Sequence, residues 1–176
     1  MNFQLTKEQE FVRKMVREFA TNEVEPLAAD IDKEHRFPVE TVEKMAKYGM
    51  LGVPFPTEYG GAGGDHISYA ITVEELSRVC ASTGVICSAH TSLCAWPIWA
   101  WGTDEQQKKY LPDLAQGTKF GAYCLTEPDA GSDANSGKTK ARLSEDGKHY
   151  IINGQKMWIS NAGFADTFTF FAKIDD

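Results

Sequence analysis

Two short segments carry residue types that could bind a flat, polar ligand. The first is residues 123–133 (YCLTEPDAGSD) and the second is residues 156–161 (KMWISN). In the first, a proline fixes φ and Gly131 permits a left-handed turn, so we expect a strand that leads into a tight loop. Such a loop offers backbone amides and the hydroxyls of Thr126 and Ser132 to a polar, partly anionic ligand.

The second segment places an indole, Trp158, two residues before a hydroxyl, Ser160. In a strand these two side chains would lie on the same face. A flat apolar surface beside a hydrogen-bond donor suits a planar heteroaromatic such as an isoalloxazine ring. Each signal also has a plainer interpretation, because Trp158 could be a core indole, Thr126 could simply end a strand, and a Gly-Ser pair is common in turns.

Both segments resemble the flavin-binding segments of the acyl-CoA dehydrogenase family. The similarity extends through EYGGAGG at residues 58–64 and AHTSLC at residues 89–94 to the last residue, and is strongest to the short-chain, butyryl-CoA type of anaerobic bacteria. The resemblance implies an oxidoreductase that uses FAD for α,β-dehydrogenation of a short-chain acyl-CoA, in the manner of butyryl-CoA to crotonyl-CoA. It also implies an electron-transferring flavoprotein as partner and a homotetramer for the full-length enzyme.

The resemblance assigns roles residue by residue. The cofactor-binding residues that it implies are Tyr123, Leu125, Thr126, Gly131, Ser132, Trp158, Ile159 and Ser160. The Thr126 hydroxyl and the adjacent main chain would hold the pyrimidine side of the flavin, Trp158 would stack on it, and Ser160 would lie near N5. The substrate-binding residues implied are Ser132, Ser92 and Leu93.

No catalytic residue is assigned within the sequence. Glu127, Asp129 and Asp133 are carboxylates near the first segment, but the resemblance places the catalytic base, a Glu, in a C-terminal helical domain that family members carry beyond the matched region. Asp129 also departs from the Gly or Asn common at its position. We therefore expect a fragment, inactive by itself, that lacks the base and the C-terminal helical bundle.

Composition narrows the classes of protein. The chain has 176 residues, a formal net charge of −7 and no Lys/Arg run, which argues against nucleic acid and anionic membranes as partners. No apolar run reaches the roughly 18 residues of a membrane-spanning helix, and the first residues lack the pattern of a signal peptide. A bacterial cytoplasmic location is the simplest expectation. The four Cys and four His show no ligand spacing, so we expect no metal site, and Cys80, Cys87 and Cys94 are interpreted as core residues.

The pattern of the chain changes near residue 119. Before it, apolar residues repeat at helical period, with capping boxes at Thr6 and Thr103, a kink or second segment near Pro26, and an interruption at Pro112. After it, strands are predicted at residues 120–125, 139–143, 150–152, 156–160 and 167–173, with hairpin turns at 146–147 and 153–154. The expectation is an α+β chain with a helical domain, 1–119, and an incomplete antiparallel β-barrel or sandwich domain, 120–176.

Two alternatives remain open at this stage. An acyl-CoA oxidase or a flavin-dependent monooxygenase on the same scaffold would differ in its reoxidant. A non-catalytic acyl-CoA or flavin-binding module would function without a base. The aromatic strand at residues 167–173 would leave an apolar edge, which complete proteins normally cover.

Overall fold

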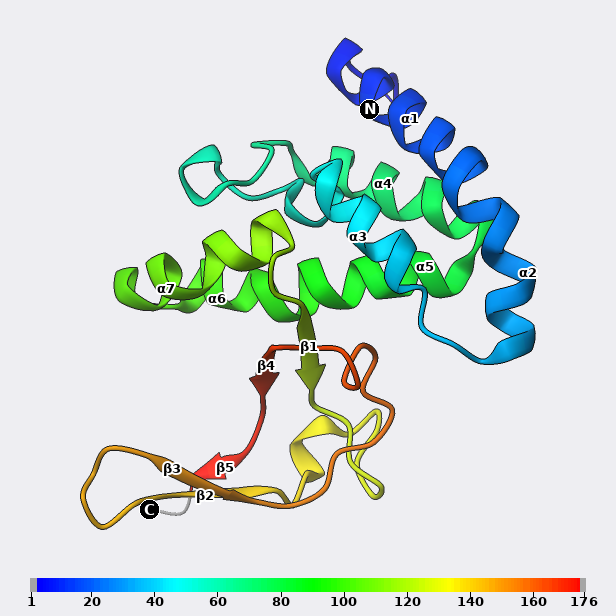
Figure 1. The fold of residues 1–176 in the computed structure, drawn as a ribbon. Helices are drawn as coiled ribbons and strands as arrows, with labels where there is room; N and C mark the ends of the chain where they lie inside the picture. Colours follow the sequence, from blue (N-terminus) through cyan, green and yellow to red (C-terminus); the bar gives the residue numbers. More distant parts are fainter. Residues whose placement is uncertain (1–2, 175–176) are drawn as a thin grey trace.

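The α-helices all precede the first strand. The computed structural model describes residues 3–174. Its α-helices are α1 (Lys7–Phe19), α2 (Glu25–Glu34), α3 (Val39–Lys47), α4 (His66–Val79), α5 (Ala81–Ser88), α6 (Trp96–Trp101) and α7 (Asp104–Gln116). Short turns of 3-10 helix are η2 (Met50–Gly52), η3 (Thr57–Tyr59) and η5 (Ala134–Ser136). The helices lie together above the strands in Figure 1.

Local signals set the helix ends as predicted. Thr6 and Thr103 each form a capping box with the glutamine three residues later, and Gly117 ends α7 with a left-handed φ of 70°. Pro112 does not interrupt this last helix, contrary to expectation, since α7 continues through it to Gln116. A proline removes one backbone donor, and the packing of Leu111 and Leu114 in the core compensates for that loss.

Two π-helical turns join successive helices, the first of them at the kink predicted near Pro26. The first, η1 (Ala20–Val24), links α1 to α2, with Pro26 in the first turn of α2. The second, η4 (Ala89–Ala95), links α5 to α6. Such turns are frequent at functional positions in helices. Here η4 packs against strands β1 (Gly121–Cys124) and β4 (Thr167–Phe170), so it connects the helices to the strand region.

Two apolar clusters form the core. The larger draws on α1, α3, α4 and α5 and includes Val16, Ala20, Met45, Leu76 and Cys87, all fully buried. Phe120, directly before the first strand, belongs to this cluster. The smaller cluster consists of Phe55, Ala95, Leu111, Leu114 and Ala115. Because Phe120 is buried among the helices, the start of β1 is fixed relative to them.

The strands are short and mostly parallel, which corrects the expectation of an antiparallel barrel or sandwich. They are β1 (Gly121–Cys124), β2 (Lys140–Leu143), β3 (Tyr150–Asn153), β4 (Thr167–Phe170) and β5 (Lys173–Ile174). β1 pairs with β4 in parallel and β2 pairs with β5 in parallel, whereas β2 and β3 form the hairpin predicted at residues 146–147. The two small sheets of the described residues do not close on each other.

The predicted second hairpin is wrong. Residues 156–160 form no strand, and Asn153-Gly154 is no hairpin turn. A Cβ at Gly154 would lie 2.3 Å from Thr139 Oγ1, so glycine serves here for close approach to the segment before β2. The chain then runs in irregular conformation toward residues 158–161, where it turns.

Candidate functional site

The two segments singled out by sequence lie side by side. The Met157 backbone N–H donates to the Thr126 carbonyl at 2.9 Å. Lys156 Nζ donates to the Leu125 carbonyl at 3.0 Å and to Glu127 Oε1 at 2.7 Å. Three consecutive residues of the first segment are therefore each held by the second, although about thirty positions separate them in sequence.

Trp158 is exposed to solvent. Its φ is 59°, a left-handed value that is rare for a bulky residue, and 84% of it is accessible. The interpretation as a core indole is therefore wrong. The strand alternation that should have placed Trp158 and Ser160 on one face does not apply, because the segment is not a strand. Ser160 is exposed and Ile159 is half-buried.

Asn161 anchors the end of this segment, a role that sequence reasoning missed. Its side chain is buried, and Nδ2 donates to the carbonyl oxygens of Ile86 and Gly121, each at 3.1 Å. Its φ is 71°, and asparagine tolerates such a left-handed conformation better than most residues. A single side chain thus ties the segment to helix α5 and to the first residue of β1. The available signal was an asparagine in a Ser-Asn-Ala-Gly stretch, which is typical of a turn.

The loop after β1 presents an exposed, open face. Glu127 and Ala130 exchange two backbone hydrogen bonds, which close a tight turn around Pro128. Beyond it, Gly131 and Ser132 are exposed, and a Cβ added to Gly131 would meet nothing within 4 Å. Backbone amides and a hydroxyl are therefore accessible here. Tyr123 and Thr126 are half-buried, and the Tyr123 ring lies edge-on to Phe171 with centroids 5.1 Å apart.

The Glu127 carboxylate is fully engaged. It accepts hydrogen bonds from Lys156 Nζ and from the backbone N–H groups of Thr139 and Lys138. The Lys156 ammonium, helped by these donors, lowers the pKa of Glu127 to about 2. A carboxylate with so low a pKa is a poor proton acceptor at neutral pH, which agrees with its rejection as catalytic base.

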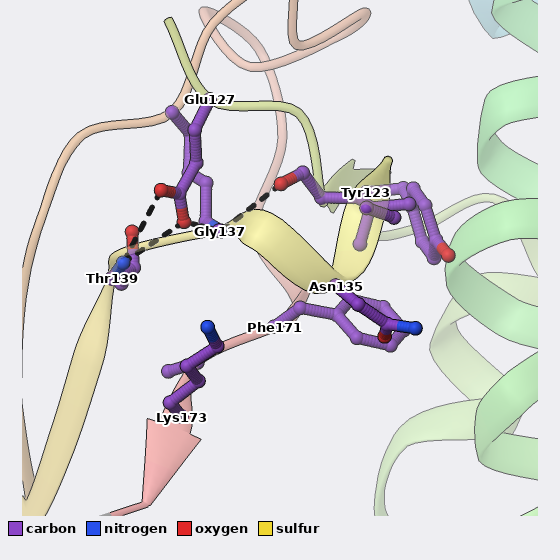
Figure 2. A pocket seen from close by; sticks show the side chains of 11 residues that line it. Tyr123, Glu127, Asn135, Gly137, Thr139, Phe171 and Lys173 are labelled. Carbon is purple, nitrogen blue, oxygen red and sulfur yellow. Dashed lines mark hydrogen bonds and ion pairs between the residues drawn. The ribbon is translucent and has the colours of Figure 1, made fainter. Parts of the chain in front are cut away.

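A hollow of about 350 Å³ opens between the first segment, the loop before β2 and the chain after β4. Figure 2 shows Tyr123 and Phe171 at one end, and Glu127 and Thr139 at the other. Its wall thus combines aromatic rings with the Glu127–Lys156 ion pair and with Lys173.

The comparisons with known proteins decide the family. Residues 6–118 match the family model for the acyl-CoA dehydrogenase N-terminal domain, and residues 122–176 match the model for the middle domain. The chain belongs to the acyl-CoA dehydrogenase family.

Relatives of this acyl-CoA dehydrogenase chain include the short-chain specific acyl-CoA dehydrogenase of Clostridium acetobutylicum, which is 62% identical over 99% of this chain and 46% of that protein. The chain thus spans about half the length of the curated relatives that it matches. Butyryl-CoA dehydrogenase from Megasphaera elsdenii has a TM-score of 0.94 at 39% identity, over 100% of this chain and 46% of that one. An acyl-CoA dehydrogenase from Bacillus anthracis, complexed with FAD, has a TM-score of 0.92 at 42% identity, over 98% of this chain and 30% of that one.

The residues of this acyl-CoA dehydrogenase chain fit FAD, which the family uses. The exposed indole of Trp158 offers a surface for stacking, and the open space at Gly131 leaves room for a pyrophosphate near the backbone. Both features belong to the two segments that hydrogen bonds join at Thr126 and Met157.

The two remaining substrate candidates lie on η4. Ser92 Oγ donates to the carbonyl of Ser88, the last residue of α5, at 2.8 Å, and Leu93 is 41% exposed. Since η4 packs on β1 and β4, these residues belong to the helical side of the junction with the strands. The structure thus places them on a different element from Ser132, the third candidate.

The cysteines behave as core residues. Cys87 and Cys94 are fully buried, Cys80 is half-buried, and all are free thiols. Burial raises the pKa of Cys87 to about 12, so this thiol is unreactive. Within residues 3–174, no cluster of three His, Cys, Asp or Glu side chains could hold a metal ion. The same part of the chain has no helix with the length and apolar character needed to span a membrane.

Proposed function

We propose that this chain forms the FAD-binding wall and part of the substrate channel of a short-chain acyl-CoA dehydrogenase. The observation that carries the proposal is the pairing of Thr126 with Met157, which sets the segment of the exposed Trp158 beside the start of the loop that carries Gly131 and Ser132. Bound FAD would supply the acceptor for the hydride that leaves the β-carbon of the acyl group.

The chain's own residues bind and orient in this proposal. Thr126 and the adjacent Leu125 main chain hold the polar edge of the ring system, and Tyr123 borders it. Trp158 and Ile159 cover the ring and exclude water, while Ser160 offers a hydroxyl. Gly131 and Ser132 receive the pyrophosphate.

The substrate would be a short-chain acyl-CoA, with Ser132 contacting it from the loop and Ser92 and Leu93 from η4. We assign the removal of the α-proton to a group outside residues 1–176. Glu127, the one carboxylate buried in the first segment, is engaged by three donors and is unsuited to that task.

Further parts of the proposal rest on the family resemblance and on the sequence pattern. They are a domain division into residues 1–119 and 120–176, an electron-transferring flavoprotein as electron acceptor, a homotetramer for the full-length protein, and a bacterial cytoplasmic location. The oxidase, monooxygenase and non-catalytic alternatives find no support in the names of the relatives, which are dehydrogenases and reductases.

The test is FAD binding by the full-length protein, followed by flavin absorbance and fluorescence. Trp158→Ala should weaken FAD binding by about 2 kcal/mol, roughly thirtyfold, through lost stacking and burial. Trp101→Ala is the matched control, because Trp101 is 78% exposed on α6 and belongs to neither segment. Equal FAD affinity in both variants would contradict the assignment of Trp158, and absence of FAD binding by the wild type would contradict the proposed function.

A further inference from the structure

A buried ion pair joins the two proposed flavin-binding segments. Lys156 Nζ and Glu127 Oε1 are 2.7 Å apart, and the two side chains are 8% and 7% exposed. Neither residue is among the expected FAD contacts. We propose that Glu127 and Lys156 are positioning residues that hold the Trp158 segment against the first segment and so set the affinity for FAD; this inference rests on the proposed function.

The contacts of Lys156 bracket the flavin-binding threonine. Its ammonium donates to the Leu125 carbonyl at 3.0 Å as well as to Glu127, so it grips the residues on either side of Thr126. The next residue along, Met157, donates its backbone N–H to Thr126 itself at 2.9 Å. Together these bonds fix the second segment against the first just before Trp158.

The carboxylate of Glu127 also binds a third segment, the residues just before β2. It accepts from the Thr139 backbone N–H at 3.0 Å and from that of Lys138. These bonds tie down the far end of the loop that carries Gly131 and Ser132, just before β2. One carboxylate therefore fixes both ends of the loop, and Lys156 adds the Trp158 segment to it.

The backbone conformation of Trp158 has to be held in place by neighbouring residues. Its φ of 59° is a conformation that a bulky residue keeps only when its surroundings impose it. The side chain itself is 84% exposed and contributes little packing to the protein. The restraint must therefore come from the neighbouring residues, with Lys156 on one side and the buried Asn161 on the other.

Because both partners are charged and buried, the effects of removing Lys156 and Glu127 are not additive. Removal of one partner leaves the other charge buried and uncompensated, which costs more than the pair itself contributes. Removal of both charges avoids that penalty. Lys156→Met should thus loosen the segment more than the double variant with Glu127→Gln, which retains an acceptor for the amides of Thr139 and Lys138.

A matched control lies in the same loop. Lys138 Nζ forms an ion pair with Asp129 at 2.8 Å, but these side chains are 74% and 71% exposed. Lys138→Met removes this pair and keeps the backbone N–H that donates a hydrogen bond to Glu127. Exposed pairs contribute little, so this variant should behave as the wild type.

The experiment has two readouts on the purified full-length protein. Amide hydrogen exchange at Met157 reports the pairing of the segments without any flavin, and titration with FAD reports the site. We expect Lys156→Met to raise Met157 exchange and the Kd for FAD by about tenfold or more each. Glu127→Gln, which leaves the buried Lys156 charge without its carboxylate partner, should raise both as well, and the double variant should show smaller increases than either single variant. Lys156→Arg should retain most of the protection, and Lys138→Met should stay within about twofold of the wild type.

The outcomes separate the inference from the proposed function. Unchanged Met157 exchange in folded Lys156→Met and Glu127→Gln proteins would overturn the positioning role, whether or not the protein binds FAD. Faster exchange with an unchanged Kd for FAD would overturn the link between the pair and the cofactor. If the wild type binds no FAD, the proposed function fails, and the link to FAD fails with it, while the exchange data still decide whether the pair holds the segments.

Discussion

The His90 imidazole accepts a hydrogen bond from the Gly121 backbone N–H at 3.0 Å, which joins η4 to the first residue of β1. The other ring nitrogen, Nε2, lies 2.9 Å from the Leu114 carbonyl near the end of α7. Because Gly121 N can only donate and Leu114 O can only accept, the ring must be neutral with its proton on Nε2. His90 is fully buried and stacks on Phe120, so one side chain fastens two helices to the strand that carries Tyr123.

This arrangement predicts a loss of stability in mild acid. Burial lowers the pKa of His90 to about 4, whereas the unfolded chain would take up the proton near pH 6.5. The unfolded state binds more protons in this interval, so the stabilising effect of neutral His90 is complete above pH 6.5 and is lost as the pH falls toward 4. Its share of the free energy of unfolding should fall by about 2 kcal/mol between pH 7 and pH 5, measured by urea unfolding.

Two variants isolate the contribution of His90. His90→Gln keeps a donor for Leu114 and removes the titrating group. The difference in free energy of unfolding between pH 7 and pH 5 should therefore shrink by about 2 kcal/mol. His149→Gln changes a histidine whose side chain is 75% exposed and should keep the full difference. The account of His90 is wrong if both variants keep the pH dependence of the wild type.

The sequence predicted the helix ends well because their signals are local. A capping box such as Thr6 with Gln9 spans four residues, and Gly117 ends α7 through its own backbone. Strand direction is not local. β1 pairs in parallel with β4, so Gly121 faces Thr167, and nothing in either short strand specifies that partner or its direction.

In the candidate site, too, local features were predicted and contacts between distant residues were not. Resemblance located the two segments, yet the alternation argument for Trp158 and Ser160 failed, since Gly154 approaches Thr139 closely instead of forming a hairpin. The anchors were missed for a related reason. Lys156, His90 and Asn161 act on backbone groups distant in sequence, and such partners are visible only in the folded chain.

Asn161→Asp should destabilise the protein at pH 7 by about 3 kcal/mol. The substitution keeps the size of the side chain but replaces two donated hydrogen bonds with a carboxylate that faces the carbonyl oxygens of Ile86 and Gly121. Urea unfolding measures the effect. Asn22→Asp, at an exposed position in η1, is the matched control and should change stability by less than about 0.5 kcal/mol. Similar stabilities for the two variants would show that Asn161 does not anchor the segment.

Gly121→Ala should be destabilising because the helices leave no space for a methyl group. A Cβ at this position would lie 2.7 Å from both Cβ and Sγ of Cys94 on η4. Relief requires η4 and β1 to separate, which would also lengthen the bond from Gly121 to His90, and overpacking of this kind costs about 1–3 kcal/mol. Gly163→Ala, where nothing lies within 4 Å and φ is not positive, should change stability by less than about 0.5 kcal/mol.

The decisive measurement for this contact is a double-mutant cycle in urea unfolding. In a Cys94→Gly background the two atoms nearest the new methyl group are absent, so Gly121→Ala should cost at least about 1 kcal/mol less than in the wild type. Equal costs in the two backgrounds would place the origin of the effect elsewhere than in the contact of β1 with η4. A reduced cost would establish that glycine is required here for the close approach of the helices to the strand that carries Tyr123.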